Sequence, residues 1–245
     1  MVRTSGPCAR RPLQTGARMP PLALIFDLDG TLIDSAPDIH ATANAVFGVH
    51  GFPPVTLALV RSFIGNGVGV LVSRLLQHHG HASPLPGAQS DPLHGDLVAE
   101  FITRYETAFA LTRLYPGVGQ ALQQLALAAH PLGLCTNKPL GPTRAALRHF
   151  GLEPYLRVVI GGDSLALRKP HPAPLHAALA GLGVQTGLFI GDSEVDAETA
   201  LAASVPFALF TEGYRKAPPD TLGASLIFDD FAHFPDLVAQ FTAGL

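Results

Sequence analysis

The chain has 245 residues, of which 47% are hydrophobic and 14% are charged, and its formal net charge is -3. This composition indicates a compact globular protein with a sizeable core and excludes a disordered chain. No basic stripe offsets the acidic residues, so we expect no nucleic-acid-binding surface, and no apolar run approaches the roughly 18 residues that a membrane-spanning helix needs.

The first 20 residues carry four arginines, no acidic residue and no apolar stretch of the kind that a secretory signal has. We expect this segment, residues 1–20, to be a disordered leader, or to precede a working start at Met19; a targeting peptide is the alternative. Cys8 lies in the leader and Cys135 in an apolar strand pattern, so a disulfide between them is not expected. The sequence therefore predicts a cytoplasmic protein.

A short apolar run, residues 22–26, ends at the sequence Asp27-Leu28-Asp29-Gly30-Thr31. Two carboxylates at the end of a buried strand are costly unless a cation or a reaction uses them. Residues two apart in an extended chain share a face, so Asp27 and Asp29 can point into one crevice. On these five residues alone, a strand followed by an ordinary Asp-Gly turn remains an alternative.

Residues 36–113 have the pattern of a helical insertion. Apolar side chains recur at helical spacing over residues 39–47, 68–76 and 97–111, and the block contains no convincing strand. A loop rich in proline, glycine and serine is expected over residues 82–95. We therefore expect a helical cap, residues 36–113, inserted after the first strand.

From residue 114 onwards, short apolar runs alternate with helical patterns. This alternation predicts an α/β fold with a doubly wound, mostly parallel, Rossmann-like sheet. The first strand belongs to that sheet, so residues 21–35 and 114–245 are expected to form the core. The further strands are predicted at residues 131–136, 157–161, 187–190, 206–210 and 226–228.

Polar residues follow the predicted strands at their carboxyl ends, where a sheet of this kind collects its ligands. The second strand ends at Thr136-Asn137-Lys138-Pro139, Lys169 follows the third, and the fourth is followed by Asp192 and Asp196. The chain has three lysines against thirteen arginines, and two of the three lie at strand ends, which suggests a need for a compact positive charge. Taken singly, each residue also has an ordinary explanation as a helix cap, a strand position or a solvated loop residue.

These motifs, in this order and on this strand pattern, resemble the haloacid dehalogenase superfamily of aspartate-nucleophile phosphohydrolases, from about residue 22 to about residue 238. The sequences around Thr136, Lys169 and Asp192 are most similar to the bacterial phosphoglycolate phosphatase branch. The resemblance implies an enzyme that hydrolyses a small phosphorylated metabolite, first of all 2-phosphoglycolate. We expect a monomer or a small homo-oligomer.

The resemblance also implies how the first motif works. Asp27 is the nucleophile that accepts the phosphoryl group as an aspartyl-phosphate, and Asp29 protonates the leaving alkoxide and later deprotonates the attacking water. A dianionic ester repels an anionic nucleophile, so the site needs positive charge. The implied cofactor is Mg²⁺, held by Asp27, Asp192 and the backbone carbonyl of Asp29.

The later motifs are implied to handle the phosphate. Lys169 balances the charge of nucleophile and phosphate, and the Thr136 hydroxyl holds the transferring oxygens. Asp196 orients Lys169 or a metal-bound water from behind. Asn137 and Lys138 either contact the substrate or serve the turn and the surface.

The cap is expected to exclude water and to complete the site when it closes. Gly65-Asn66-Gly67 precedes one of its helices and can offer backbone amides to an anion, although an ordinary helix start explains it equally well. Gly65 and Asn66, with the nearby Arg61, are the candidates for recognising the non-phosphate end of the substrate.

Other functions remain open at this stage. A phosphomutase of the β-phosphoglucomutase kind, or a sugar-phosphate phosphatase of the same superfamily, also needs both aspartates. A non-catalytic module that binds phosphorylated ligands is the alternative from another class, and the complete set of charged residues disfavours it. A C-halogen hydrolase would not need Asp29, and a phosphonate hydrolase would need a lysine in its cap, which contains none.

Overall fold

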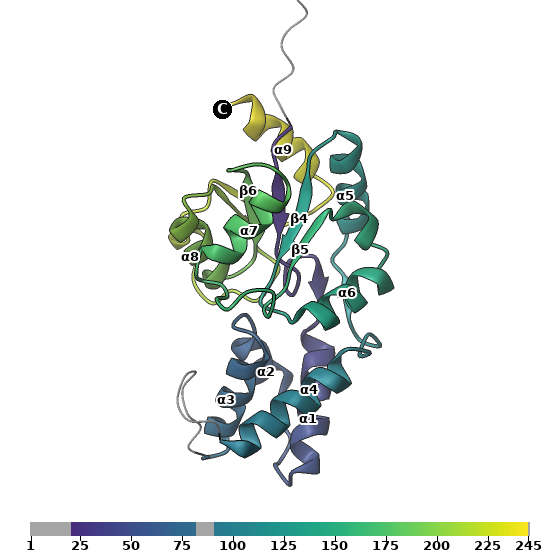
Figure 1. The fold of residues 1–245 in the computed structure, drawn as a ribbon, viewed down its shortest axis with the longest axis vertical. Coiled ribbons are helices and arrows are strands. Elements are labelled where there is room, and N and C mark those ends of the chain that lie inside the picture. The colour runs from purple at the N-terminus through teal and green to yellow at the C-terminus, as the bar shows by residue number, and fades with distance from the viewer. Residues whose placement is uncertain (1–20, 82–90, 245) are drawn as a thin grey trace, which may run out of the picture.

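The computed structural model describes residues 21–81 and 91–244 (Figure 1). The expected leader and most of the expected loop at 82–95 therefore lie outside the described residues. Six parallel strands form the main sheet in the order β5-β4-β1-β6-β7-β8, which confirms the doubly wound prediction. The strands are β1 (Leu24–Phe26), β4 (Leu132–Cys135), β5 (Val158–Ile160), β6 (Leu188–Gly191), β7 (Phe207–Phe210) and β8 (Leu226–Phe228).

Helices cover both faces of this sheet, because the strands at the centre of the sheet carry apolar side chains on both faces. Leu24 and Phe26 of β1 face one layer, and Ile25 between them faces the other. The first layer contains α5 (Val118–Leu127), α6 (Leu140–His149) and α9 (Phe234–Ala243). The second contains α7 (Ala173–Gly181) and α8 (Glu194–Ala203) (Figure 1).

Four helices lie beyond the carboxyl ends of the strands and form a separate lobe (Figure 1). They are α1 (Ala36–Val49), α2 (Leu57–Phe63), α3 (Val68–His78) and α4 (Pro92–Tyr105). This lobe has its own apolar cluster, in which Val72, Leu75 and Phe101 are fully buried. A two-stranded antiparallel ribbon of β2 (Ile33–Asp34) and β3 (Arg113–Leu114) carries the chain into the lobe and out again. We propose that residues 36–113 form the cap and that residues 21–35 and 114–244 form the core, because each lobe packs around its own cluster.

The last cap helix differs from the prediction over residues 97–111. It begins at Pro92, so residues 92–95 are helical and do not belong to the expected loop. The Asp91 side chain accepts the Leu93 N–H and caps this start, and a proline in the first turn needs no amide partner there. The helix ends at Tyr105, earlier than predicted. Beyond it, the N–H of Thr112 donates to the carboxylate of Asp38 in α1, so this segment is held by a contact to another helix and does not continue α4.

Helix α2 and the ribbon of β2 and β3 have no counterpart in the sequence prediction. Helix α2 has seven residues and is capped by Thr56, and each ribbon strand has two, so neither gives a periodic signal. Within the two described ranges, no helix is long and apolar enough to cross a membrane.

Candidate active site

The loop after β1 is shaped by the close approach of Gly30 to the carboxylate of Asp192. Asp27 extends the strand by one residue, since its N–H donates to Ile190 O of β6 at 2.8 Å. Gly30 has a φ of +91°, and a Cβ built there would lie 2.4 Å from the Asp192 carboxylate. Only glycine permits both the conformation and the contact. Thr31 then donates its hydroxyl to Asp192 Oδ1 at 2.8 Å. The loop therefore brings the ends of β1 and β6 together.

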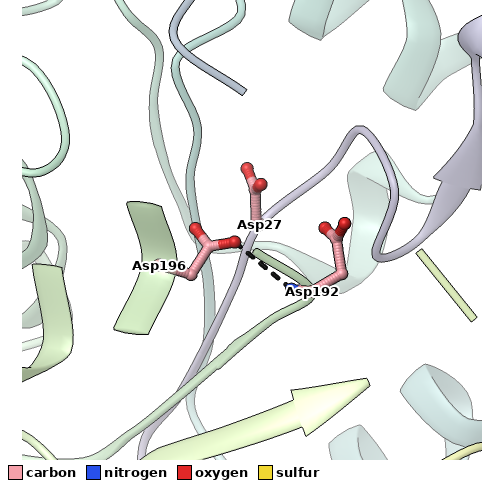
Figure 2. Close-up of side chains that lie close together, drawn as sticks. All are labelled: Asp27, Asp192 and Asp196. Carbon is pink, nitrogen blue, oxygen red and sulfur yellow. Dashed lines mark hydrogen bonds between the residues drawn. The ribbon is translucent and has the colours of Figure 1, made fainter. Parts of the chain in front are cut away.

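Three buried carboxylates meet at this point: Asp27, Asp192 and Asp196 (Figure 2). One oxygen from each lies within 4.8 Å of the others, and Figure 2 shows the three groups facing the same space. The ammonium of Lys169, which is 2% exposed, lies 2.9 Å from Asp27 Oδ1 and 2.7 Å from Asp196 Oδ1. A cluster of three carboxylates therefore contains one lysine, which forms ion pairs with two of them.

The electrostatics of the cluster reflect this excess of negative charge. Burial raises the pKa of Asp27 to about 6, and Asp196 adds to the rise although Lys169 opposes it. Burial, followed by the charges of Asp196 and Asp27, raises the pKa of Asp192 well above its usual range. Burial alone would lower the pKa of Lys169, but Asp196 and Asp27 outweigh it, so the pKa of this lysine is raised. If all three carboxylates are ionised, the charge of Lys169 does not balance them, and a second cation would stabilise the cluster.

The oxygen atoms of the cluster fit a divalent metal ion. Asp196 is the most fully engaged of the three, because Oδ1 accepts from Lys169 and Oδ2 accepts three hydrogen bonds, from the N–H groups of Asp192 and Ser193 and from the Ser193 hydroxyl. Asp27 Oδ1 makes no hydrogen bond despite its ion pair with Lys169, whose approach is poorly aligned. Asp192 is fixed by two hydrogen bonds and keeps further lone pairs. Asp27 and Asp192 are therefore the side chains able to bind a metal ion, with Asp196 holding the lysine.

Asp29 lies beside Asp27 but has different partners. Its Oδ1 accepts the Ser35 hydroxyl at 2.6 Å and the Lys138 ammonium at 3.1 Å. Lys138 is 3% exposed and also donates to the Tyr105 hydroxyl of α4 at 2.5 Å. Burial raises the pKa of Tyr105 well above its usual value, so this phenol keeps its proton. Lys138 of the core thus connects Asp29 to the Tyr105 hydroxyl of the cap helix.

Asp27 and Asp29 both open into a cavity of about 50 Å³ between the two lobes. Polar side chains line its core side, and apolar side chains and glycines line most of its cap side. The core supplies Asp27, Asp29, Thr136, Asn137 and Lys138, and the cap supplies Ile39, Ile64, Gly65, Gly67, Val68, Leu71, Phe101 and Tyr105.

Some of the other residues singled out in the sequence line this cavity, and some lie outside its lining. Thr136, 3% exposed, lines it directly after β4. Asn137 donates its amide to the backbone oxygens of Gly65 at 2.9 Å and Lys169 at 3.0 Å, which ties the cap loop to the core. Asn66 is not part of the lining, and its Oδ1 accepts from Arg74 of α3. Arg61 also lies outside the lining, and its guanidinium pairs with Asp34 at 3.2 Å.

Sequence reasoning missed two tyrosines at this site. Tyr105 ends a helix whose limits were misplaced, and Tyr214 lies in an irregular segment after β7, where no periodic signal exists. The Tyr214 N–H donates to Asp192 Oδ2 at 2.6 Å. Its hydroxyl accepts the N–H groups of Ser35 and Ala36 and donates to Asp34. Two signals pointed to Lys138, its position at the end of a predicted strand and the scarcity of lysine in the chain.

Comparisons with known proteins agree with this geometry. Residues 24–210 match the family model of the haloacid dehalogenase-like hydrolases. The phosphoglycolate phosphatase of Cereibacter sphaeroides is 47% identical over 221 residues, which are 90% of this chain and 99% of that protein. The phosphoglycolate phosphatase of Rhodobacter capsulatus is 46% identical over 220 residues, with 90% and 98% covered.

A solved structure matches the whole architecture. The crystal structure of a predicted phosphoglycolate phosphatase from Haemophilus somnus superposes with a TM-score of 0.81 at 30% identity, over 89% of this chain and 97% of that chain. The similarity therefore includes the cap as well as the sheet.

Proposed function

Because this chain belongs to the haloacid dehalogenase-like hydrolase family and is a phosphatase, we propose that it hydrolyses 2-phosphoglycolate to glycolate and phosphate with Mg²⁺ as cofactor. The observation that supports this most is the pairing of Asp27 and Asp29 at one cavity of about 50 Å³. A cavity of that size suits a substrate with few heavy atoms beyond the phosphate. A cytoplasmic location and a monomeric or small homo-oligomeric state are part of the same proposal.

In the proposed reaction, a carboxylate oxygen of Asp27 forms a bond to phosphorus as the bond to the ester oxygen breaks. Asp29 gives its proton to the departing oxygen, which leaves as glycolate. Asp29 then takes a proton from a water molecule that attacks the aspartyl-phosphate, and this releases phosphate and restores Asp27. Ser35 and Lys138 hold the Asp29 carboxylate through both steps.

The charge of the phosphate is balanced by two kinds of group. When bound by Asp27, Asp192 and the backbone carbonyl of Asp29, Mg²⁺ supplies positive charge that offsets repulsion between ester and nucleophile. Lys169 supplies a fixed positive charge 2.9 Å from the nucleophile, and Asp196 keeps it there. In this proposal the Thr136 hydroxyl and the Asn137 backbone hold the transferring oxygens, and the position of both residues in the cavity lining supports it.

The test is a turnover assay on the purified full chain with Mg²⁺ and a panel of small phosphate esters. The panel contains 2-phosphoglycolate, 3-phosphoglycerate, glucose 1-phosphate, glucose 6-phosphate and ethyl phosphate. We expect the highest kcat/KM for 2-phosphoglycolate and no turnover after chelation of the metal. A preference for a glucose phosphate would move the assignment to a sugar-phosphate enzyme, and interconversion of the two glucose phosphates would show a phosphomutase. Binding without turnover of any ester would show a non-catalytic module.

A further inference from the structure

We infer that Lys138 and Tyr105 form the subsite that binds the carboxylate of the substrate, so that the enzyme selects phosphate esters with an anionic group next to the ester carbon. This inference rests on the proposed function, because it needs a substrate with such a group. Lys138 comes from the loop after β4 and Tyr105 from the last turn of α4, and both line the cavity that holds Asp27 and Asp29.

The position of the leaving group places a carboxylate near Lys138. The leaving oxygen must touch Asp29, because Asp29 protonates it. In 2-phosphoglycolate, one methylene group separates that oxygen from the carboxylate carbon. The Lys138 ammonium lies 3.1 Å from Asp29 Oδ1, so a group two bonds beyond the leaving oxygen comes within hydrogen-bonding reach of it.

No other cation among the described residues lines this cavity. Lys169 is held between Asp27 and Asp196 and is committed to the phosphate side of the site. Arg61, a candidate from the sequence, is 43% exposed and paired with Asp34. Arg168 has a guanidinium near Gly67 but is exposed and does not line the cavity. A carboxylate in the cavity thus has one cation to bind.

One of the three hydrogen bonds that the Lys138 ammonium donates is long. It donates to Asp29 Oδ1 at 3.1 Å and to the Tyr105 hydroxyl at 2.5 Å, but its bond to Asp29 Oδ2 is 3.4 Å. Burial lowers the pKa of this lysine from its usual value, although Asp29 opposes the change. A substrate carboxylate would offer the buried cation a closer acceptor than Asp29 Oδ2 and an additional negative charge.

Tyr105 fixes the ammonium and limits the size of the subsite. The Lys138 Nζ atom lies 3.8 Å from the centre of the Tyr105 ring, and the hydroxyl accepts from it. Phe101 and Leu71 line the cavity beside Tyr105 and leave an apolar wall around one polar position. Because Tyr105 belongs to the cap, the subsite is complete only when α4 lies over the core.

The experiment compares 2-phosphoglycolate with ethyl phosphate, which has the same ester linkage and a methyl group in place of the carboxylate. For Lys138→Met we expect kcat/KM on 2-phosphoglycolate to fall roughly 30- to 100-fold, mostly through KM, as for loss of a charge-assisted hydrogen bond. On ethyl phosphate the fall should be clearly smaller, because that substrate loses only the support that Lys138 gives to Asp29. Tyr105→Phe keeps the ring and should raise KM for 2-phosphoglycolate several-fold, which provides a second reading if Lys138→Met does not fold.

Arg168→Met is the matched control, since it removes a cation near the cap loop that does not line the cavity. We expect it to leave the ratio of the two kcat/KM values unchanged. Equal losses on both substrates in Lys138→Met would show that this lysine serves Asp29 alone and would overturn the inference. If the wild type itself does not prefer 2-phosphoglycolate to ethyl phosphate, the proposed function has failed. If the wild type prefers it and both variants keep that preference, the function stands and the subsite lies elsewhere.

Discussion

The three clustered acids differ in how many hydrogen bonds their oxygens accept. Asp196 has both oxygens engaged by Lys169 and by donors at the start of α8. Asp27 and Asp192 keep free lone pairs and face the same space (Figure 2). The sequence already placed these acids at strand ends, because strand and turn patterns are local. It could not show which oxygen is engaged, because that depends on Lys169, Thr31 and partners far away in the chain.

Replacing Asp27 by asparagine should lower kcat by roughly a thousandfold or more, because an amide is a far poorer nucleophile than a carboxylate. The fold should persist, since asparagine has nearly the same shape and Asp196 still pairs with Lys169. Phosphate release and circular dichroism measure the two effects. Asp220→Asn, at an exposed position, is the control. A folded Asp27→Asn protein with near wild-type turnover would rule out the covalent route.

Asp27 should also make stability depend on pH in the metal-free protein. Its pKa rises from an ordinary value of 3.8 to about 6 in the folded state, so the folded state binds this proton more tightly than the unfolded state. The resulting stabilisation is present below pH 3.8 and is lost as the pH rises through about 6. In EDTA, Asp27→Asn should therefore gain melting temperature relative to the wild type between about pH 4 and about pH 7. A difference that stays constant over this range would contradict the raised pKa.

Among the elements, the β2–β3 ribbon and its neighbours connect the cap to the cluster of three carboxylates. Tyr214 contacts Asp192 through its backbone and the start of α1 through its hydroxyl. The cluster of three carboxylates and the entrance to the cap therefore share one residue. Neither contact is visible in a sequence pattern, because the partners lie far from Tyr214 along the chain. The apolar strands of the main sheet and the helices α1 and α3 were predictable for the opposite reason, since short apolar runs and helical periodicity are local signals.

Tyr214→Phe should lower the free energy of unfolding by about 1–3 kcal/mol, because the Ser35 and Ala36 N–H groups lose their acceptor while buried. The backbone bond to Asp192 remains, so kcat/KM should fall equally for 2-phosphoglycolate and ethyl phosphate. Urea unfolding and the two assays measure these effects. Tyr155→Phe is the control, because that hydroxyl bonds no other residue in the described part of the chain. A selective loss on 2-phosphoglycolate would mean that Tyr214 shapes the substrate subsite.

At the scale of the whole molecule, the order of the strands assembles the site. β1 lies between β4 and β6, so Asp27, Thr136 and Asp192 follow three adjacent strands. Because ligands of a parallel sheet bind at the carboxyl ends of its strands, the sequence alone predicted that these residues lie at one edge of the sheet. The position of the cap over it was not predictable in detail. The contact of Tyr105 with Lys138 depends on how two separately packed lobes meet, and no local pattern records that.

Binding of Mg²⁺ should stabilise the whole fold, because the ion binds a site that exists only in the folded state. We expect the melting temperature of the wild type to rise with added Mg²⁺ and to return to its starting value after EDTA. In Asp192→Asn the rise should be much smaller, since one of the two carboxylates proposed to bind the ion is gone. Asp220→Asn again serves as the control and should respond like the wild type. An equal rise in Asp192→Asn would place the bound ion elsewhere.

The central position of β1 also determines when the sheet can form during synthesis. Leu24 is made early, but its two strand partners, Leu132 and Leu188, emerge from the ribosome only much later. Until then both edges of an entirely apolar strand lack their partners, which is a state prone to aggregation. The cap helices find their main partners among themselves and can pack while the rest is still being made. The insertion after β1 thus delays completion of the core, and slow translation beyond the cap would lengthen the period in which β1 lacks its partner strands.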